Sequence, residues 1–197
     1  MSEALASVGA MSRTVFLTAS TLNGFLADSD DSLEWLFAVP GGDSGGEEFE
    51  RFLDGVGVLV QGSSTYEWVV RHEDLTAHPE KWPAYYGARP TFVFTSRTLP
   101  AVPGADVRFV SGPVTDHWET IREAAAGRDV WVVGGGDLAG QFADAGLLDE
   151  LVVTFAPATL TAGKPLMPRT IGADRLELLE ATKRGPFAEL RYRVSSA

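Results

Sequence analysis

Three consecutive glycines stand between a β-branched apolar stretch and a helical pattern within residues 130–145. A strand that passes through a glycine turn directly into a helix leaves backbone amides free to bind an anion, and the helix dipole strengthens that attraction. The sequence therefore predicts a phosphate-binding turn, and a plain tight turn with Asp137 as helix cap is the alternative. The residues of this turn are Val133, Gly134, Gly135, Gly136, Asp137 and Leu138.

Two other segments have the same position relative to a predicted strand. One offers helix-start amides and hydroxyls after residues 56–61, although ordinary helix capping would explain the same residues. The other places an arginine after residues 91–95, where its guanidinium could bind a phosphate or simply lie in solvent. Open α/β sheets bind ligands at the carboxyl ends of their strands, so the three segments together predict a nucleotide site. The added residues are Gly62, Ser63, Ser64 and Thr65, and Ser96 and Arg97.

The elements that must position these segments alternate between strands and helices. This alternation predicts an α/β fold with a mainly parallel sheet covered on both faces, and Gly185-Pro186 predicts an antiparallel hairpin at its C-terminal edge. The glycine turn follows a late strand, so the Rossmann pattern of G-x-G-x-x-G after the first strand does not apply. Strands are expected at 13–19, 56–61, 91–95, 107–110, 130–133, 149–156, 176–182 and 188–194, helices near 33–36, 47–53, 66–70, 114–126 and 138–145, and a loop at 71–89.

Length and composition restrict the classes of protein. With 197 residues, we expect a disordered lead-in at 1–12 and one domain at 13–197. A formal net charge of −11 argues against nucleic-acid binding, and no apolar run approaches the roughly 18 residues of a membrane span, so we expect a cytoplasmic protein. The chain has no cysteine, and its three histidines are scattered, so no metal site is predicted.

Short motifs in a fixed order carry a resemblance to a known family. The chain resembles the dihydrofolate reductase-like family, and within it the branch of the C-terminal reductase domain of the bifunctional riboflavin-biosynthesis deaminase-reductase. The resemblance extends over residues 12–194, nearly the whole chain. The matching segments are Thr21–Ala27, Gly62–Glu67, Thr95–Arg97, Val132–Leu138, Asp149–Pro157 and Gly163–Leu166.

The resemblance implies a three-layer fold with about eight strands, in a homodimeric bacterial-type cytoplasmic enzyme. It implies a reductase that transfers a hydride from NADPH to a small planar heterocycle resembling a pterin, a pyrimidine or a flavin precursor. In the deaminase-reductase branch that activity is 5-amino-6-(5-phosphoribosylamino)uracil reductase.

The resemblance also assigns the cofactor contacts. Residues 134–138 would meet the diphosphate, residues 62–65 the diphosphate and adenosine phosphate, and Ser96 with Arg97 the 2′-phosphate. Ala19 would face the nicotinamide carboxamide, and residues 23–26 would form a mobile loop over that ring.

The chain departs from the family pattern at the 2′-phosphate pocket. The family often has two basic residues where Ser63 and Ser64 stand, so preference for NADPH rests on Arg97 and NADH is not excluded. This loss of charge keeps an alternative open, in which the protein binds a nucleotide or small molecule without reductase activity.

The first predicted helix and its surroundings contain a candidate proton donor and candidate substrate-binding residues. A carboxyl group whose pKa is raised by burial is the usual donor. The candidates are Asp28, Asp31 and Glu34, and Glu34 is chosen because it stands beside Trp35 in an apolar helix. Asn23, Trp35 and Phe49 are the candidate substrate contacts, the two aromatic rings by stacking. The alternatives are a solvated glutamate and aromatic rings in the core.

Overall fold

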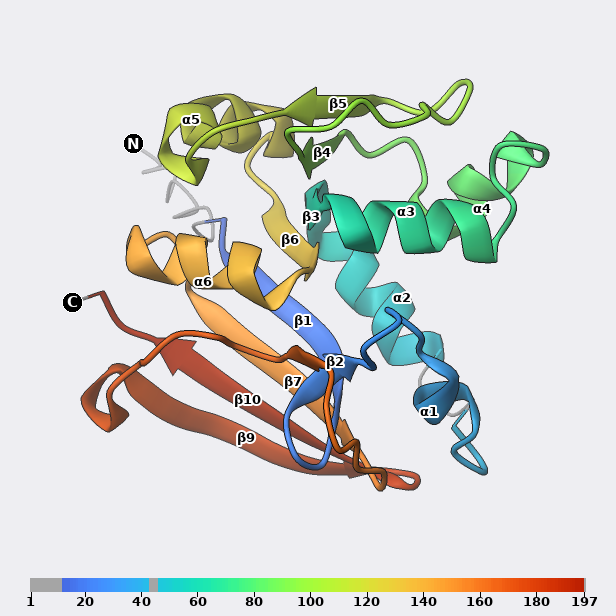
Figure 1. Cartoon of the computed structure of the whole chain (residues 1–197). Helices are drawn as coiled ribbons and strands as arrows, with labels where there is room; N and C mark the ends of the chain where they lie inside the picture. The colour runs from blue at the N-terminus through green and yellow to red at the C-terminus, as the bar shows by residue number, and fades with distance from the viewer. Residues whose placement is uncertain (1–11, 43–45, 197) are drawn as a thin grey trace, which may run out of the picture.

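An eight-stranded sheet forms the centre of the computed structural model, which describes residues 12–42 and 46–196 (Figure 1). Apart from Ser12, the lead-in predicted at 1–12 lies outside the described residues. The strand order is β5-β4-β3-β6-β1-β7-β10-β9. The strands are β1 (Thr14–Thr21), β3 (Val56–Gly62), β4 (Thr91–Phe94), β5 (Val107–Val110), β6 (Asp129–Gly134), β7 (Glu150–Ala156), β9 (Leu176–Arg184) and β10 (Phe187–Val194).

The pairing of the strands agrees with the sequence prediction. Strands β5, β4, β3, β6, β1 and β7 are paired in parallel, and β10 runs antiparallel to both β7 and β9. The β9–β10 hairpin turns at Gly185, whose φ of 55° suits glycine. The mainly parallel sheet with an antiparallel C-terminal edge is confirmed.

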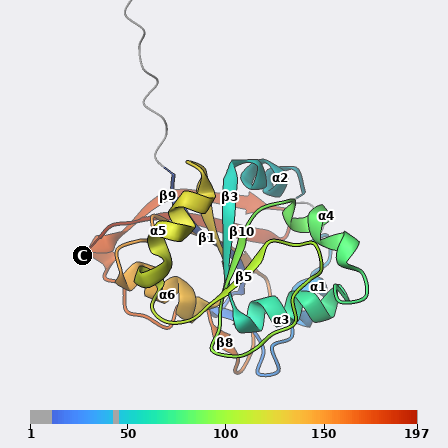
Figure 2. The same ribbon diagram turned by 90° about the horizontal axis from the view of Figure 1, so that it is seen from above.

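Helices cover both faces of this sheet, which gives the predicted three layers (Figure 2). Helices α5 (Val114–Ala125) and α6 (Gly136–Asp144) pack on one face around buried Phe16 and Phe142. The other face is covered by α1 (Glu34–Phe37), α2 (Gly46–Gly55), α3 (Ser63–His72) and α4 (Trp82–Tyr86).

The loop predicted at 71–89 is correct for residues 73–78 and 87–89 and wrong for the rest, which is helical. Helix α3 continues to His72, and a 3₁₀ turn (Pro79–Lys81) leads directly into α4. Trp82 and Tyr86 lie four residues apart on one helix face and are both buried, with ring centroids 4.8 Å apart. Pro83 suggested a break, but proline is tolerated in the first turn of a helix.

A second, two-stranded sheet was not predicted. It pairs β2 (Phe25–Ala27) with β8 (Lys164–Pro165), and both strands are too short to give a periodic signal. The amide of Asn23 donates a hydrogen bond to the carbonyl of Leu160 at 2.7 Å and accepts one from its N–H at 3.2 Å. The segment expected to close over the nicotinamide is therefore attached to residues 158–165.

Candidate functional site

The three predicted ligand-binding segments meet at one end of the strands, where the parallel strands of the sheet have their carboxyl ends. Strands β4, β3 and β6 are neighbours, with Gly62 opposite Phe94 and Gln61 opposite Gly134. Residues 62–65, 95–97 and 134–138 therefore extend from the carboxyl ends of adjacent parallel strands. Strand β1, which carries Ala19, is the next strand along.

Two helices begin at these carboxyl ends without a side-chain cap. Helix α6 starts after Gly135, whose φ is 97°, and α3 starts after Gly62; in neither does a side chain bond the free amides. A Cβ built on Gly135 would lie 4.0 Å from the Gly62 backbone, so the helix starts are adjacent. The first turns of both helices thus lie side by side with amides that no N-cap side chain binds, and we call these residues the amide cradle (residues 62–65 and 134–138).

The amide cradle depends on the absence of side chains at its glycines. A Cβ on Gly134 would lie 2.7 Å from Oγ1 of Thr65, and one on Gly136 would lie 2.4 Å from the carbonyl oxygens of Pro165 and Leu166. Both distances are shorter than real Cβ contacts. These clashes explain why the sequence has three glycines where a simple turn needs only one with positive φ.

A carboxylate in the amide cradle is neutralised by an arginine that the sequence analysis missed. Asp137 accepts hydrogen bonds from Gln141 at 2.9 Å and from Arg169 at 2.8 Å, and these bonds lower the pKa of its carboxyl. Arg169 also binds Asp144 at 2.8 Å and crosses α6 over Gly140. The sequence signal for a cation at this position was the spacing of Asp137 and Asp144, which are seven residues apart and therefore lie on one face of the helix.

Arg97, predicted to bind the 2′-phosphate, is held by a neighbouring carboxylate. Its Nη1 donates a hydrogen bond to Oε1 of Glu67 at 3.1 Å, and its Nη2 lies 2.5 Å from Oε2. The arginine side chain is 54% exposed, and Ser96 beside it is exposed as well. Any phosphate at this position must compete with Glu67.

A cavity of about 580 Å³ opens beside β1, on the sheet face covered by α1 and α2. This volume is in the range of small-molecule sites. Ala19 and Phe49 both line the cavity, together with Leu36 and Phe37 of α1. Strands β7 and β10 contribute alternate residues, because every second side chain points to the same face, whereas β1 contributes a run of three consecutive residues, 17–19.

Three predicted residues lie outside the lining of this cavity. Glu34 is exposed, and both ends of the Asn23 amide bond other parts of the chain. Trp35 is half-buried, and its Nε1 is buried without a hydrogen-bond partner among the described residues. Leu36 and Phe37 occupy the positions on α1 that we expected the tryptophan to fill.

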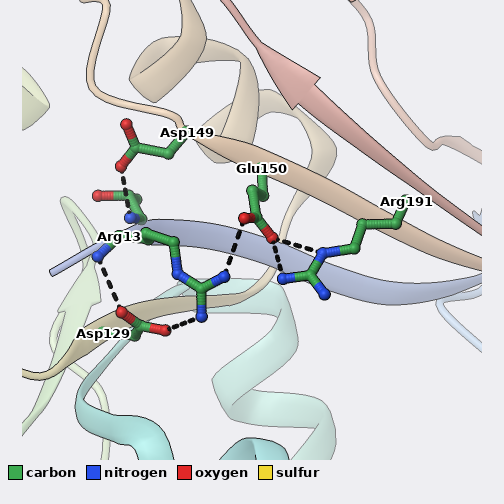
Figure 3. A network of polar contacts seen from close by, with 6 residues as sticks. Arg13, Asp129, Asp149, Glu150 and Arg191 are labelled. Carbon is green, nitrogen blue, oxygen red and sulfur yellow. Dashed lines mark hydrogen bonds and ion pairs between the residues drawn. The ribbon is translucent and has the colours of Figure 1, made fainter. Parts of the chain in front are cut away.

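The end of the cavity remote from Ala19 contains a charge network that the sequence analysis did not identify (Figure 3). Glu150 lies between two arginines, 2.9 Å from Nη1 of Arg13 and 2.6 Å from Nη2 of Arg191. Asp129 also binds Arg13, at 2.6 Å, and raises its pKa. Period-two alternation of Glu189, Arg191 and Arg193 in β10 was the sequence signal for this polar sheet face.

Within residues 12–42 and 46–196, no group of three His, Asp or Glu side chains is arranged to hold a metal ion. Over the same ranges, no helix combines the length and apolar character needed to cross a bilayer.

Comparisons with known proteins identify a family model and several folds that the chain matches. Residues 14–187 match the model of the RibD C-terminal domain. The uncharacterized protein YwjB of Bacillus subtilis (strain 168) is 28% identical over 187 residues, which cover 91% of this chain and 97% of that protein.

Solved structures show the same fold. A Shewanella sp. PV-4 protein provisionally assigned to riboflavin biosynthesis has a TM-score of 0.73 at 24% identity, with 94% of this chain and 99% of that chain covered. A Thermotoga maritima diaminohydroxyphosphoribosylaminopyrimidine deaminase/5-amino-6-(5-phosphoribosylamino)uracil reductase gives 0.64 at 14% identity, over 93% and 57% of the chains. Dihydrofolate reductase from Enterococcus faecalis, complexed with NADP(H), gives 0.57 at 16% identity, over 92% and 96%.

Proposed function

Because the chain belongs to the RibD C-terminal domain family, we propose that it is an NADPH-dependent reductase that transfers a hydride to a small planar heterocycle. The structural relatives support the reaction class: one is a deaminase/reductase, and another is a dihydrofolate reductase that binds NADP(H). The homodimer and the cytoplasmic location are part of the same proposal.

One observation carries the proposal, namely the order of features along the sheet edge. Arg97 follows β4, the amide cradle follows β3 and β6, and Ala19 lies on β1 beside the cavity. Neighbouring strands are about 4.8 Å apart, so the span from β4 to β1 is roughly 14 Å. This order matches an extended dinucleotide, with its 2′-phosphate, diphosphate and nicotinamide meeting the three features in turn.

The residues present fit this cofactor. The clashes that any Cβ at Gly134 or Gly136 would cause leave bare backbone where a diphosphate needs close approach. Amides of residues 63–65 and 136–138 would bind the phosphate oxygens, and the hydroxyls of Ser63 and Ser64 would add hydrogen bonds. Bound NADPH would supply the hydride.

The remaining roles fall to residues around the cavity. Leu36, Phe37 and Phe49 would exclude water from the reacting ring, while Trp35 would support α1 behind them. Asn23 would hold the loop before β2 in place through its bonds to Leu160.

Glu34 remains the proposed proton donor. Its carboxyl is exposed at the start of α1, two residues before the cavity-lining Leu36. Proton delivery from this position therefore requires an intervening water or a movement of α1.

The test is a titration of the purified protein with NADPH and NADH, followed by the fluorescence of the reduced nicotinamide. We expect saturable NADPH binding below about 1 mM, the upper end of usual enzyme affinities. We also expect oxidation of the bound cofactor by at least one member of a panel of pterins and pyrimidines. Absence of binding by either cofactor would refute the reductase assignment.

Binding without oxidation across that panel would favour the alternative function, a nucleotide-binding protein without reductase activity. The observation behind this alternative is the Glu67–Arg97 ion pair, together with serines at 63 and 64.

A further inference from the structure

Charged side chains line much of the cavity, and glutamates outnumber arginines among them. The charged residues of the lining are Arg13, Arg184, Arg191, Glu48, Glu150, Glu180 and Glu189. This composition is relevant to the substrate, because a phosphorylated molecule needs a cation that is free to pair with it.

Every arginine of the lining is already paired with carboxylates. Arg184 contacts Glu48 of α2 and lies 2.8 Å from Oε1 of Glu189 on β10. Arg13 and Arg191 share Glu150, which is only 8% exposed. Both arginines bind the same buried carboxylate, so moving either one to a phosphate would remove a counter-charge from Glu150.

A phosphate in this cavity would therefore meet more repulsion than attraction. If Arg184 turned to a phosphate, Glu48 and Glu189 would lose their cation while lying beside a second anion. Glu180 adds a fourth carboxylate, whose bonding partner is the hydroxyl of Thr182 at 2.8 Å, not an arginine.

The groups nearest Ala19 suit a ring that donates hydrogen bonds. Thr154 lies opposite Ala19 in the β1–β7 register, and Glu189 lies opposite Thr154 in the β7–β10 register. All three line the cavity, and the Thr154 hydroxyl donates to the Glu189 carboxylate at 3.2 Å. An ionised carboxylate accepts about four hydrogen bonds, so the two Glu189 oxygens, which bind Arg184 and Thr154, keep capacity to accept from a ring N–H or amino group.

We propose that the substrate of this cavity is an uncharged or cationic, N–H-bearing planar heterocycle without a phosphate group, selected by the Glu48–Arg184–Glu189 cluster. The inference rests on the proposed reductase function for its choice of cavity, and it differs from the phosphorylated substrate named for the Thermotoga relative.

The experiment compares 5-amino-6-(5-phosphoribosylamino)uracil with its dephosphorylated form by calorimetric titration of the full chain without cofactor. We expect the dephosphorylated compound to bind at least about tenfold more tightly, a difference of about 1.4 kcal/mol. Glu48→Gln should then strengthen binding of the phosphorylated compound on the order of fivefold, because it removes one carboxylate from Arg184. The same substitution should change binding of the dephosphorylated compound by less than about twofold.

Glu47→Gln is the matched control, since it removes a neighbouring exposed carboxylate of α2 that is outside the lining. It should leave both affinities unchanged. Equal or tighter binding of the phosphorylated compound to the unaltered protein would overturn the inference, and so would binding of neither compound. If the protein prefers the dephosphorylated compound but does not bind NADPH, the reductase function is refuted and the inference about the substrate stands.

Discussion

Replacing Glu67 by glutamine should strengthen NADPH binding selectively, because Glu67 is paired with Arg97, the proposed partner of the 2′-phosphate. The two side chains are 29% and 54% exposed, and exposed ion pairs contribute about 0–1 kcal/mol. NADPH binding has to break this pair, so its removal should raise NADPH affinity by about twofold to fivefold. NADH has no 2′-phosphate and should bind with unchanged affinity.

The opposite change, Arg97→Ala, removes the group that we propose to bind the 2′-phosphate. Hydrogen bonds to a charged group contribute about 1.5–3 kcal/mol, so NADPH affinity should fall roughly tenfold to 100-fold while NADH affinity stays within about twofold. Nicotinamide fluorescence titrations of the two variants measure both effects. Glu119→Gln, which breaks an exposed pair with Arg122 on α5, is the control and should change neither affinity. Equal changes for NADPH and NADH in either variant would refute the role of Arg97.

Three further substitutions test separate parts of the structure. Gly135→Ala forces alanine to a φ of 97°, so it should cost about 1–3 kcal/mol of stability and abolish NADPH binding. Gly127→Ala, at a φ of 79° before the amino end of β6, is the control and should cost similar stability but keep binding. Retained binding in both variants would contradict the role of the amide cradle. Gln61→Leu should raise the free energy of unfolding by about 1–3 kcal/mol, because Gln61 is fully buried and both polar atoms of its amide are without a partner among the described residues. A lower melting temperature for this variant would instead indicate that a water or ligand binds the Gln61 amide. Glu34→Gln should lower kcat about 100-fold with little change in NADPH affinity if Glu34 supplies the proton, and an unchanged kcat would assign protonation elsewhere.

The sheet and the amide cradle could be predicted because their signals are local. A β-branched run, a glycine turn and a helical period occur within a dozen residues around Gly135, and the rule that ligands bind at carboxyl strand ends then brought three segments together. The pairing of β3 with both β4 and β6 confirmed that the three segments lie together. Helix α4 was missed because Pro83 is a break signal in a helix interior and a favourable residue in a first turn.

The charge arrangement could not be predicted because it depends on long-range contacts. Glu67 and Arg97 are 30 residues apart, and Arg13 and Glu150 are 137 apart. In the sequence each of these residues looks like an ordinary solvated charge. The side of α1 that faces the cavity could not be predicted either, because a helix of four residues is too short to show an apolar face in its sequence.

The most direct test of the dinucleotide site is an NMR titration of the ¹⁵N-labelled protein with NADPH, with the backbone amides assigned. The structure predicts that the largest chemical shift changes fall on the amides of residues 62–65 and 134–138 and saturate below about 1 mM. Unchanged amides in both segments at that concentration, or saturable changes confined to other parts of the chain, would contradict the assignment.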